Sequence, residues 1–193
     1  YMQLMLQKAK TNNIEITKEA FRVHGKSSTL FEGLEDHSWF QRLNAFADGH
    51  GLTLEHYIIS SGTQEMIEGS SIAEDFKAIF ASRYIYDASG HAEWPSLAIN
   101  YTTKTQFLFR INKDGDTDIP AMKMTSHYGG HSIAAYDPER NSRSLDKIHN
   151  LIADGRVNFV APADYKENAP MDILVKGILG RISRAEALLR ANG

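Results

Sequence analysis

From about residue 51 onward, the sequence alternates short apolar runs with segments of helical periodicity, and this alternation is the strongest constraint on the fold. Short apolar runs between turn signals are typical of buried strands, whereas apolar residues three or four apart are typical of helices. Strands that alternate with helices favour a mostly parallel sheet covered on both faces. We therefore predict an α/β fold with three α/β/α layers. The predicted strands are residues 56–59, 79–81 (with an extension to 86 as the longer alternative), 132–136 and 157–160. Helices are predicted over residues 63–68, 104–113 and 144–153 and from about 171.

The first 50 residues have the periodicity of helices rather than of strands. Met2, Leu6 and Ala9 fall on one face of a helix, and Gly25 is a stop signal for the next one. Three helices are predicted here, over residues 2–10, 17–24 and 39–46.

Composition excludes several classes of function. The 193 residues carry a formal net charge of −3 and no cysteine. The weak charge does not favour nucleic acid, and the lack of cysteine rules out disulfides and thiolate chemistry. No apolar run reaches the roughly 18–20 residues of a membrane helix, and residues 1–6 are too short a run for a secretory signal. We predict a cytoplasmic protein that binds neither nucleic acid nor a membrane, and leave its oligomeric state open.

Small residues follow the first predicted strand. Ser60, Ser61 and Gly62 form a predicted turn, where backbone N–H groups can approach an anion beside the N-terminus of the next helix. The alternative is a plain strand-to-helix turn in which Ser61 and Gln64 form a capping box. Taken alone, this segment fits the plain turn somewhat better.

Lys104 is predicted in the first turn of a helix, because Thr103 and Gln106 have the spacing of a capping box. A cation at this place opposes the helix dipole at a cost of a few tenths of a kcal/mol, which a bound anion would offset. An exposed lysine without a ligand is the equal alternative.

Residues 114–118 place three carboxylates at alternating positions, an arrangement that suits Mg²⁺ or Ca²⁺. A calcium loop of the EF-hand type would need glycine and glutamate where Ile119 and Thr125 stand, so a magnesium loop fits better. A solvated acidic turn remains the simple alternative. The cluster also follows a predicted helix directly, whereas functional loops of parallel sheets follow strands. We infer that a strand before Asp114 is missing from these residues.

The order of these motifs resembles the haloacid dehalogenase (HAD) superfamily of phosphotransferases. Members have a Ser or Thr at the end of the second core strand, a Lys at a later helix start, and an acidic loop of the GDGxTD type. Ser60, Lys104 and residues 114–118 match this order. The similarity extends over most of the chain after about residue 31, including residues 56–68, 100–113 and 118–138, and is to a bacterial HAD-like phosphatase subgroup.

The resemblance implies a HAD-like core over residues 31–193 and a small helical cap-like segment over residues 1–30. It implies that Ser60, with Ser61 and Gly62, binds the phosphoryl group and that Lys104 neutralises its charge. Asp114 would bind Mg²⁺ directly, and Asp118 would bind it through water or orient Lys104. The family's aspartate nucleophile lies in a DxDxT motif, which is absent from these residues.

These expectations describe a Mg²⁺-dependent phosphomonoester hydrolase that acts on a small phosphorylated substrate through an aspartyl-phosphate. The nucleophilic aspartate would then lie outside the 193 residues. The alternatives are a non-catalytic phosphate- or metal-binding module that has lost the motif, and an interaction domain without a ligand.

Overall fold

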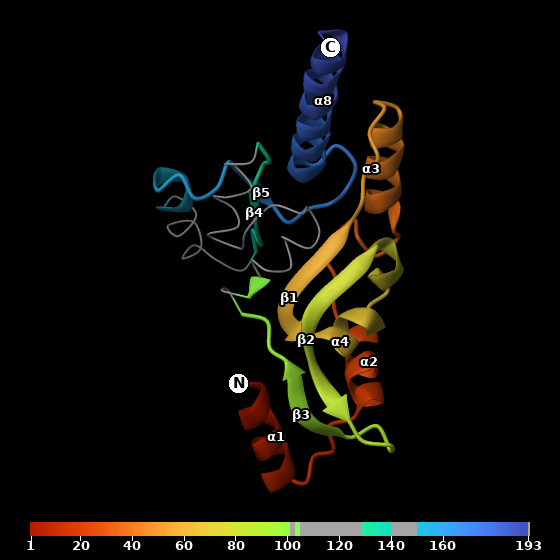
Figure 1. The fold of residues 1–193 in the computed structure, drawn as a ribbon, viewed down its shortest axis with the longest axis vertical. Coiled ribbons are helices and arrows are strands. Elements are labelled where there is room, and N and C mark those ends of the chain that lie inside the picture. The colour runs from red at the N-terminus through yellow and green to blue at the C-terminus, as the bar shows by residue number, and fades with distance from the viewer. Residues whose placement is uncertain (101–102, 105–128, 140–149, 193) are drawn as a thin grey trace. The chain divides into compact units, whose positions relative to one another are not determined.

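The computed structural model describes residues 1–100, 103–104, 129–139 and 150–192 (Figure 1). The chain divides into two compact units, Tyr1–Thr29 with His56–Ala121 (unit 1) and Leu30–Glu55 with Met122–Gly193 (unit 2). Unit 1 contains the helices α1 (Met2–Thr11), α2 (Lys18–Lys26), α4 (Gln64–Gly69) and η1 (Ala73–Asp75), and the strands β1 (Tyr57–Thr63), β2 (Ala78–Tyr86) and β3 (Ala92–Leu97). Unit 2 contains α3 (Ser38–Asp48), β4 (Ile133–Tyr136), β5 (Phe159–Pro162) and α8 (Pro170–Ala191).

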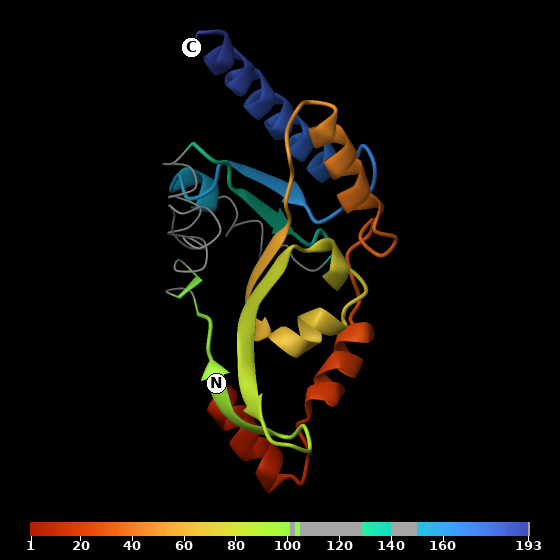
Figure 2. The same cartoon turned by 45° about the vertical axis from the view of Figure 1, so that its right-hand side comes forward.

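The sheet of unit 1 has the strand order β1-β2-β3. β1 and β2 run parallel, and the chain between them forms α4 and η1 (Figure 2). β3 is antiparallel to β2 and was not predicted; it contains Pro95, a residue type that is confined to edge strands and bulges within sheets. The structure has this proline opposite Tyr84 on β3, which is an edge strand of the described sheet. The turn between β2 and β3 is closed by the Asp87 carboxylate, which accepts hydrogen bonds from the N–H groups of Ser89 and His91 at 2.9 and 2.8 Å.

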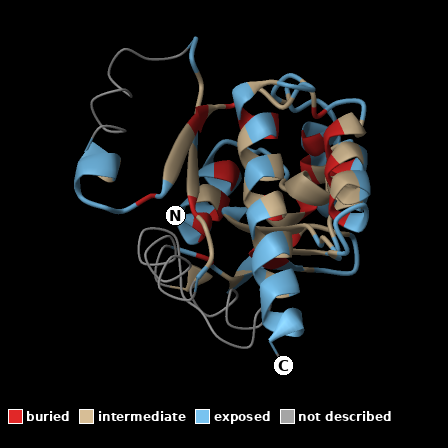
Figure 3. Ribbon diagram, turned by 90° about the horizontal axis from the view of Figure 1, so that it is seen from above, coloured by how far each residue is buried: buried red, intermediate tan, exposed pale blue. Residues whose placement is uncertain are grey.

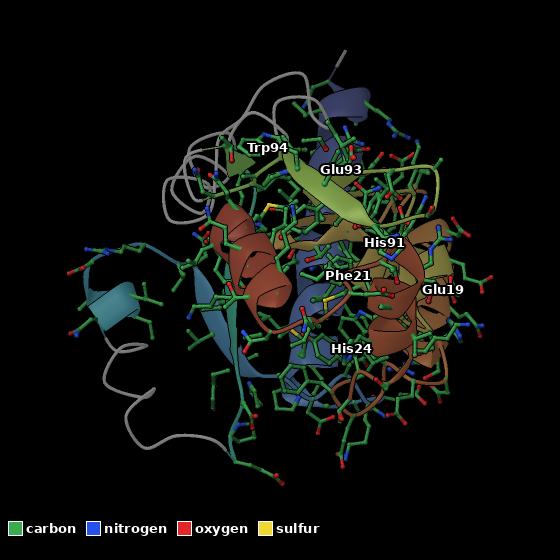
Figure 4. All side chains as sticks on the ribbon, turned by 90° about the horizontal axis from the view of Figure 1, so that it is seen from below. Glu19, Phe21, His24, His91, Glu93 and Trp94 are labelled. Atoms are coloured by element: carbon green, nitrogen blue, oxygen red, sulfur yellow. The ribbon has the colours of Figure 1, made fainter. Side chains whose placement is uncertain are left out.

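The core of unit 1 lies between helices and sheet. Met2 and Leu6 from α1, Phe21 from α2 and Tyr84 from β2 are buried together, and Phe21 stacks on Tyr84 with ring centroids 5.9 Å apart. Phe21 leaves α2 toward this core, whereas Trp94 on β3 is 56% exposed (Figure 4). The apolar residues that recur at helical spacing in α1 and α2 therefore lie on the face of each helix that is buried in this core.

In unit 2, β4 and β5 are parallel, and α3 packs against α8. The buried start of α8 contrasts with its exposed C-terminal part (Figure 3). Arg42 of α3 donates to the carbonyl of Tyr165 at 2.8 Å, and its Nε lies 3.6 Å from the Asp172 carboxylate. Asp172 is fully buried and accepts from the Asn168 N–H at 3.0 Å and from Lys176 at 2.8 Å. One carboxylate therefore connects α3, α8 and the loop before α8.

The environment of Asp172 makes the stability of unit 2 depend on pH. Burial alone would raise the pKa of Asp172, but hydrogen bonds from Lys176 and Asn168 and the charges of Lys176 and Arg42 outweigh it and lower the pKa. A lowered folded-state pKa stabilises the fold above the unfolded value of about 3.9, and this contribution is lost as pH falls through the folded pKa. We expect Asp172→Asn to cost about 2 kcal/mol at neutral pH and to flatten the decline of stability below about pH 4.

Urea unfolding at a series of pH values measures this effect. Asp48→Asn, at an exposed position of α3, is the matched control and is expected to leave the profile unchanged. An unchanged pH profile in Asp172→Asn would show that the carboxylate contributes nothing through its charge.

Most predicted elements are present within the described residues. The predicted helices at residues 2–10, 17–24 and 39–46 correspond to α1, α2 and α3, although α2 continues past Gly25 to Lys26. The four predicted strands correspond to β1, β2, β4 and β5. β2 covers the longer alternative up to Tyr86, and the bounds of the other three are shifted. Residues 150–153 are helical, as predicted for 144–153, and residues 144–149 lie outside the described residues.

The chain is a mixed α/β protein, and the β1–β2 and β4–β5 pairs are parallel. The finer three-layer arrangement remains a prediction. The first 29 residues form one compact unit with β1–β3, whereas the sequence suggested a cap-like segment over residues 1–30 and a core over residues 31–193. The cap-like role of residues 1–30 stays a prediction. Of the helices in the described ranges, none has the length and apolarity required to span a bilayer.

Candidate functional site

The end of β1 is irregular at the residues predicted to bind phosphate. Ser60 still pairs regularly with β2, but the next paired residue of β1 is Thr63, which faces Ser82. Ser61 and Gly62 are therefore extra residues in β1, as in a β-bulge. The predicted turn at residues 60–62 was wrong: the strand continues to Thr63, because the bulge redirects the backbone without ending the strand.

A hydrogen bond inside this bulge orients Ser60. The Gly62 N–H donates to the Ser60 Oγ at 3.0 Å. A hydroxyl that accepts one bond still has its own proton to donate, so Ser60 can donate to an anion. The alternative role for these residues, a capping box of Ser61 with Gln64, is wrong, since the N-cap of α4 is Thr63 and forms no side-chain cap bond.

Ser82 connects the bulge to a segment about 40 residues further along the chain from β1. This side chain on β2 is only 3% exposed. Its Oγ donates to the Ser61 carbonyl at 3.1 Å and accepts from the Ile99 N–H at 2.9 Å. A bulge disrupts the ladder locally, and the Ser82 hydroxyl supplies a partner for the Ser61 carbonyl.

The Ile99 segment leads into the helix start that carries Lys104. Thr103 N–H donates to Asn100 Oδ1 at 3.0 Å, and Asn100 N–H donates to Thr103 Oγ1 at 2.7 Å. These reciprocal bonds have the pattern of a capping box with Asn100 as the N-cap. The Lys104 N–H donates to the Asn100 carbonyl at 3.0 Å, which is a helical bond. Lys104 therefore lies in a first helical turn as predicted, but the cap is Asn100 rather than Thr103; Gln106 lies outside the described residues.

A cavity of about 650 Å³ lies where the bulge and this helix start meet. Small-molecule sites commonly enclose about 300–1,000 Å³, so a small phosphorylated molecule fits. One part of the wall is polar and is formed by Ser61, Gly62, Ser82 and Asn100. The other part is mostly apolar and is formed by Tyr1, Met2, Ala98 and Ile99.

The first turn of α1 is held at this cavity by Tyr84. Its hydroxyl donates to the Met2 carbonyl at 3.0 Å. Burial, together with smaller contributions from the nearby Tyr1 and Glu65, raises the pKa of Tyr84 to about 12. The phenol is therefore neutral at physiological pH and keeps the proton that it donates to α1.

The structure brings part of the predicted site together. Ser61 and Gly62 line the cavity, and Ser60 adjoins them in the bulge. Lys104 lies four residues after Asn100, which also lines the cavity. The predicted metal ligands Asp114 and Asp118 lie outside the described residues.

Sequence reasoning missed Ser82 and Asn100. Ser82 is a polar residue within a largely apolar strand pattern, which is a signal for a buried hydroxyl with a backbone partner. Asn100 precedes Thr103 by three residues, the spacing of an N-cap and its N3 partner. Both signals are weak without the tertiary partners Ser61 and Ile99.

Within the part of the chain that the structure describes, no three His, Cys, Asp or Glu side chains are grouped to hold a metal ion. The predicted magnesium ligands Asp114 and Asp118 are not part of this finding, because they lie outside the described residues. The donor set of the predicted site, three closely spaced carboxylates in residues 114–118, is of the kind that Mg²⁺ binds.

Comparison with known proteins adds no family to this description. No protein-family model matches the chain, and no curated protein matches it significantly.

Proposed function

We propose that the protein is a Mg²⁺-dependent phosphomonoester hydrolase of the HAD type, acting in the cytoplasm on a small phosphorylated substrate. The observation that supports this proposal is the cavity of unit 1, where the Ser61–Gly62 bulge and the Asn100–Lys104 helix start meet. These two segments are the ones that the motif order selects for binding phosphate.

The residues of this cavity suit a phosphoryl group. Ser60, oriented by the Gly62 N–H, donates a hydrogen bond from its hydroxyl group to a phosphoryl oxygen. The N-terminus of a helix favours negative charge, so the helix predicted from Lys104 onward, with Asn100 as its N-cap, would add a favourable field. Lys104 in its first turn contributes a full positive charge, which is unfavourable for the helix alone and favourable beside an anion.

The proposed reaction needs a nucleophile in addition to these groups. Attack by an aspartate carboxylate on phosphorus breaks the bond to the leaving alkoxide and forms an aspartyl-phosphate, which water then hydrolyses. Ser60 and Lys104 stabilise the charge that spreads over the phosphoryl oxygens in both steps. Asp114 and Asp118 are the residues that would hold Mg²⁺, which when bound supplies further neutralisation of the phosphate.

A non-catalytic phosphate-binding module is the second candidate. The observation that favours it is the absence of a DxDxT motif from the 193 residues. Such a module would use the same cavity and the same Lys104, and it would bind inorganic phosphate without releasing it from an ester.

Turnover of p-nitrophenyl phosphate by the purified natural protein, including any chain that flanks these 193 residues, tests the proposal. With Mg²⁺ we expect steady release of p-nitrophenol, loss of activity on chelation, and at least a 10²-fold lower rate in Asp114→Asn. Calorimetry with Mg²⁺ is expected to show binding by the wild type and by the control Asp48→Asn, but not by Asp114→Asn.

Three outcomes separate the candidates. Turnover supports the hydrolase. Phosphate binding without turnover supports the module, and neither binding nor turnover excludes both in favour of an interaction domain. Equal, negligible Mg²⁺ heats for wild type and Asp114→Asn would remove the metal from the proposal.

A further inference from the structure

The side-chain oxygen of Ser82 is hydrogen-bonded to two segments that line the cavity, the bulge and the residue before the helix cap. This Oγ donates to the Ser61 carbonyl at 3.1 Å and accepts from the Ile99 N–H at 2.9 Å. Ser61 belongs to the bulge, and Ile99 directly precedes the helix cap Asn100. We propose that Ser82 is a positioning residue for phosphoryl transfer, which sets the spacing between the bulge and the helix start of Lys104. This inference rests on the proposed function.

The geometry leaves Ser82 little freedom. The side chain is 3% exposed, and its hydroxyl uses its donor and an acceptor position on the two backbone groups. Replacement by alanine would leave the Ser61 carbonyl and the Ile99 N–H without this partner. A buried backbone group that loses its partner recovers it by moving toward water or another group. The bulge and the cap segment would then move independently.

Such a movement bears directly on the site. Ser60 lies next to Ser61 in the bulge, and Lys104 is connected to Ile99 through the Asn100 cap. Two groups that act on the same phosphoryl group must keep their separation, and a misplacement of about 1 Å costs on the order of 10²-fold in rate. Ser82 lines the cavity, but its hydroxyl is bound to two backbone groups, so its proposed effect on catalysis is through the positions of Ser60 and Lys104.

This role predicts a particular kinetic pattern. With p-nitrophenyl phosphate and Mg²⁺, we expect Ser82→Ala to lower kcat by about 10- to 100-fold and to change KM by less than about 3-fold. Ser82→Thr keeps the hydroxyl and is expected to recover kcat to within about 5-fold of wild type. Ser82→Cys keeps the size with a much weaker hydrogen-bonding group, and is expected to behave like alanine.

Ser96→Ala is the matched control. Ser96 is an exposed serine on the neighbouring strand β3, and its Oγ donates to the Arg83 carbonyl at 3.2 Å. The same type of bond is thus removed from the same sheet away from the cavity. Wild-type kcat and KM are expected for this variant.

Amide hydrogen exchange provides a second readout that does not depend on turnover. In Ser82→Ala, exchange at Ile99 is expected to accelerate by at least about 10-fold relative to the amides of β1 and β2. This result would show that the bond to Ile99 exists in solution even if alanine also lowers the melting temperature.

The outcomes distinguish this inference from the function on which it rests. If wild type and Ser96→Ala both lack turnover, the hydrolase and the role of Ser82 fall together. If wild type is active and Ser82→Ala keeps its kcat, only the role of Ser82 is overturned. If Ser82→Ala does not fold, equal kcat values for the threonine and cysteine variants would overturn it.

Discussion

Lys104→Ala is expected to lower the turnover of p-nitrophenyl phosphate by at least about 10²–10³-fold. Its ammonium group is the cation that the proposed site places against the phosphoryl oxygens. Removing a preorganised charge from such a site costs activity because the charge that develops on the phosphoryl oxygens is then less well neutralised. Steady-state kinetics with saturating Mg²⁺ measure the loss.

The stability of the Lys104→Ala variant is expected to be equal to that of wild type or slightly higher. Lys104 lies in the first turn of its helix, where a positive charge is unfavourable by a few tenths of a kcal/mol. The free energy of unfolding of the alanine variant should therefore lie within about 1 kcal/mol of the wild-type value. Loss of activity in a folded protein is the signature of a functional lysine rather than a structural one.

Lys10→Ala is the matched control, because Lys10 is exposed near the end of α1 and lies away from the cavity wall. This variant should keep wild-type kinetics. Full turnover in Lys104→Ala would mean that the lysine is wrongly assigned, whereas equal losses in both variants would point to a general charge effect.

Gly25→Ala is expected to destabilise unit 1 by about 3 kcal/mol. A Cβ at Gly25 would lie 2.0 Å from the Met66 carbonyl oxygen and 2.9 Å from the Gly69 Cα. A substitution on the other helix meets the same obstacle, since a Cβ at Gly69 of α4 would lie 2.2 Å from the Arg22 carbonyl oxygen of α2. α2 and α4 therefore touch backbone to backbone, and a methyl group would force the helices apart. Since all three contacted atoms belong to the main chain, rotating a side chain cannot relieve these contacts.

Urea unfolding with Gly177→Ala as the control measures the effect. Gly177 is an exposed residue inside α8, and a Cβ there meets nothing within 4 Å. Alanine at this position should stabilise the protein by about 0.5–1 kcal/mol, because it has the higher helix propensity. Stability equal to wild type in Gly25→Ala would contradict the close contact of α2 with α4.

The prediction of the fold was most successful where the signals are local. Thr17 accepts a hydrogen bond from the Ala20 N–H at 3.1 Å and starts α2, as the sequence indicates. Trp39 and Leu43 are buried on one face of α3. β3 was missed because its Pro95 is acceptable only at a sheet edge, and the position of a strand within a sheet depends on residues far away in the sequence.

The candidate site shows the same division. Local patterns made Ser60, Ser61, Gly62 and Lys104 candidates, and the resemblance of the motif order to the HAD superfamily selected them over the plain alternatives. Their environment was only partly predicted. The bulge replaces the expected turn because strand pairing is decided by β2, and no local pattern in residues 60–62 specifies it.

By itself, the sequence determined the α/β class, the helix starts and the small, polar or charged residues that could meet a phosphate. These properties depend on periodicity and caps, which involve residues only a few positions apart. Only the tertiary structure decided that the Ser61–Gly62 bulge and Asn100 line one cavity and that the buried Ser82 hydroxyl joins them. The reason is physical: that hydroxyl finds its two backbone partners about 20 residues before it and 17 residues after it, through strand pairing that no short-range pattern encodes.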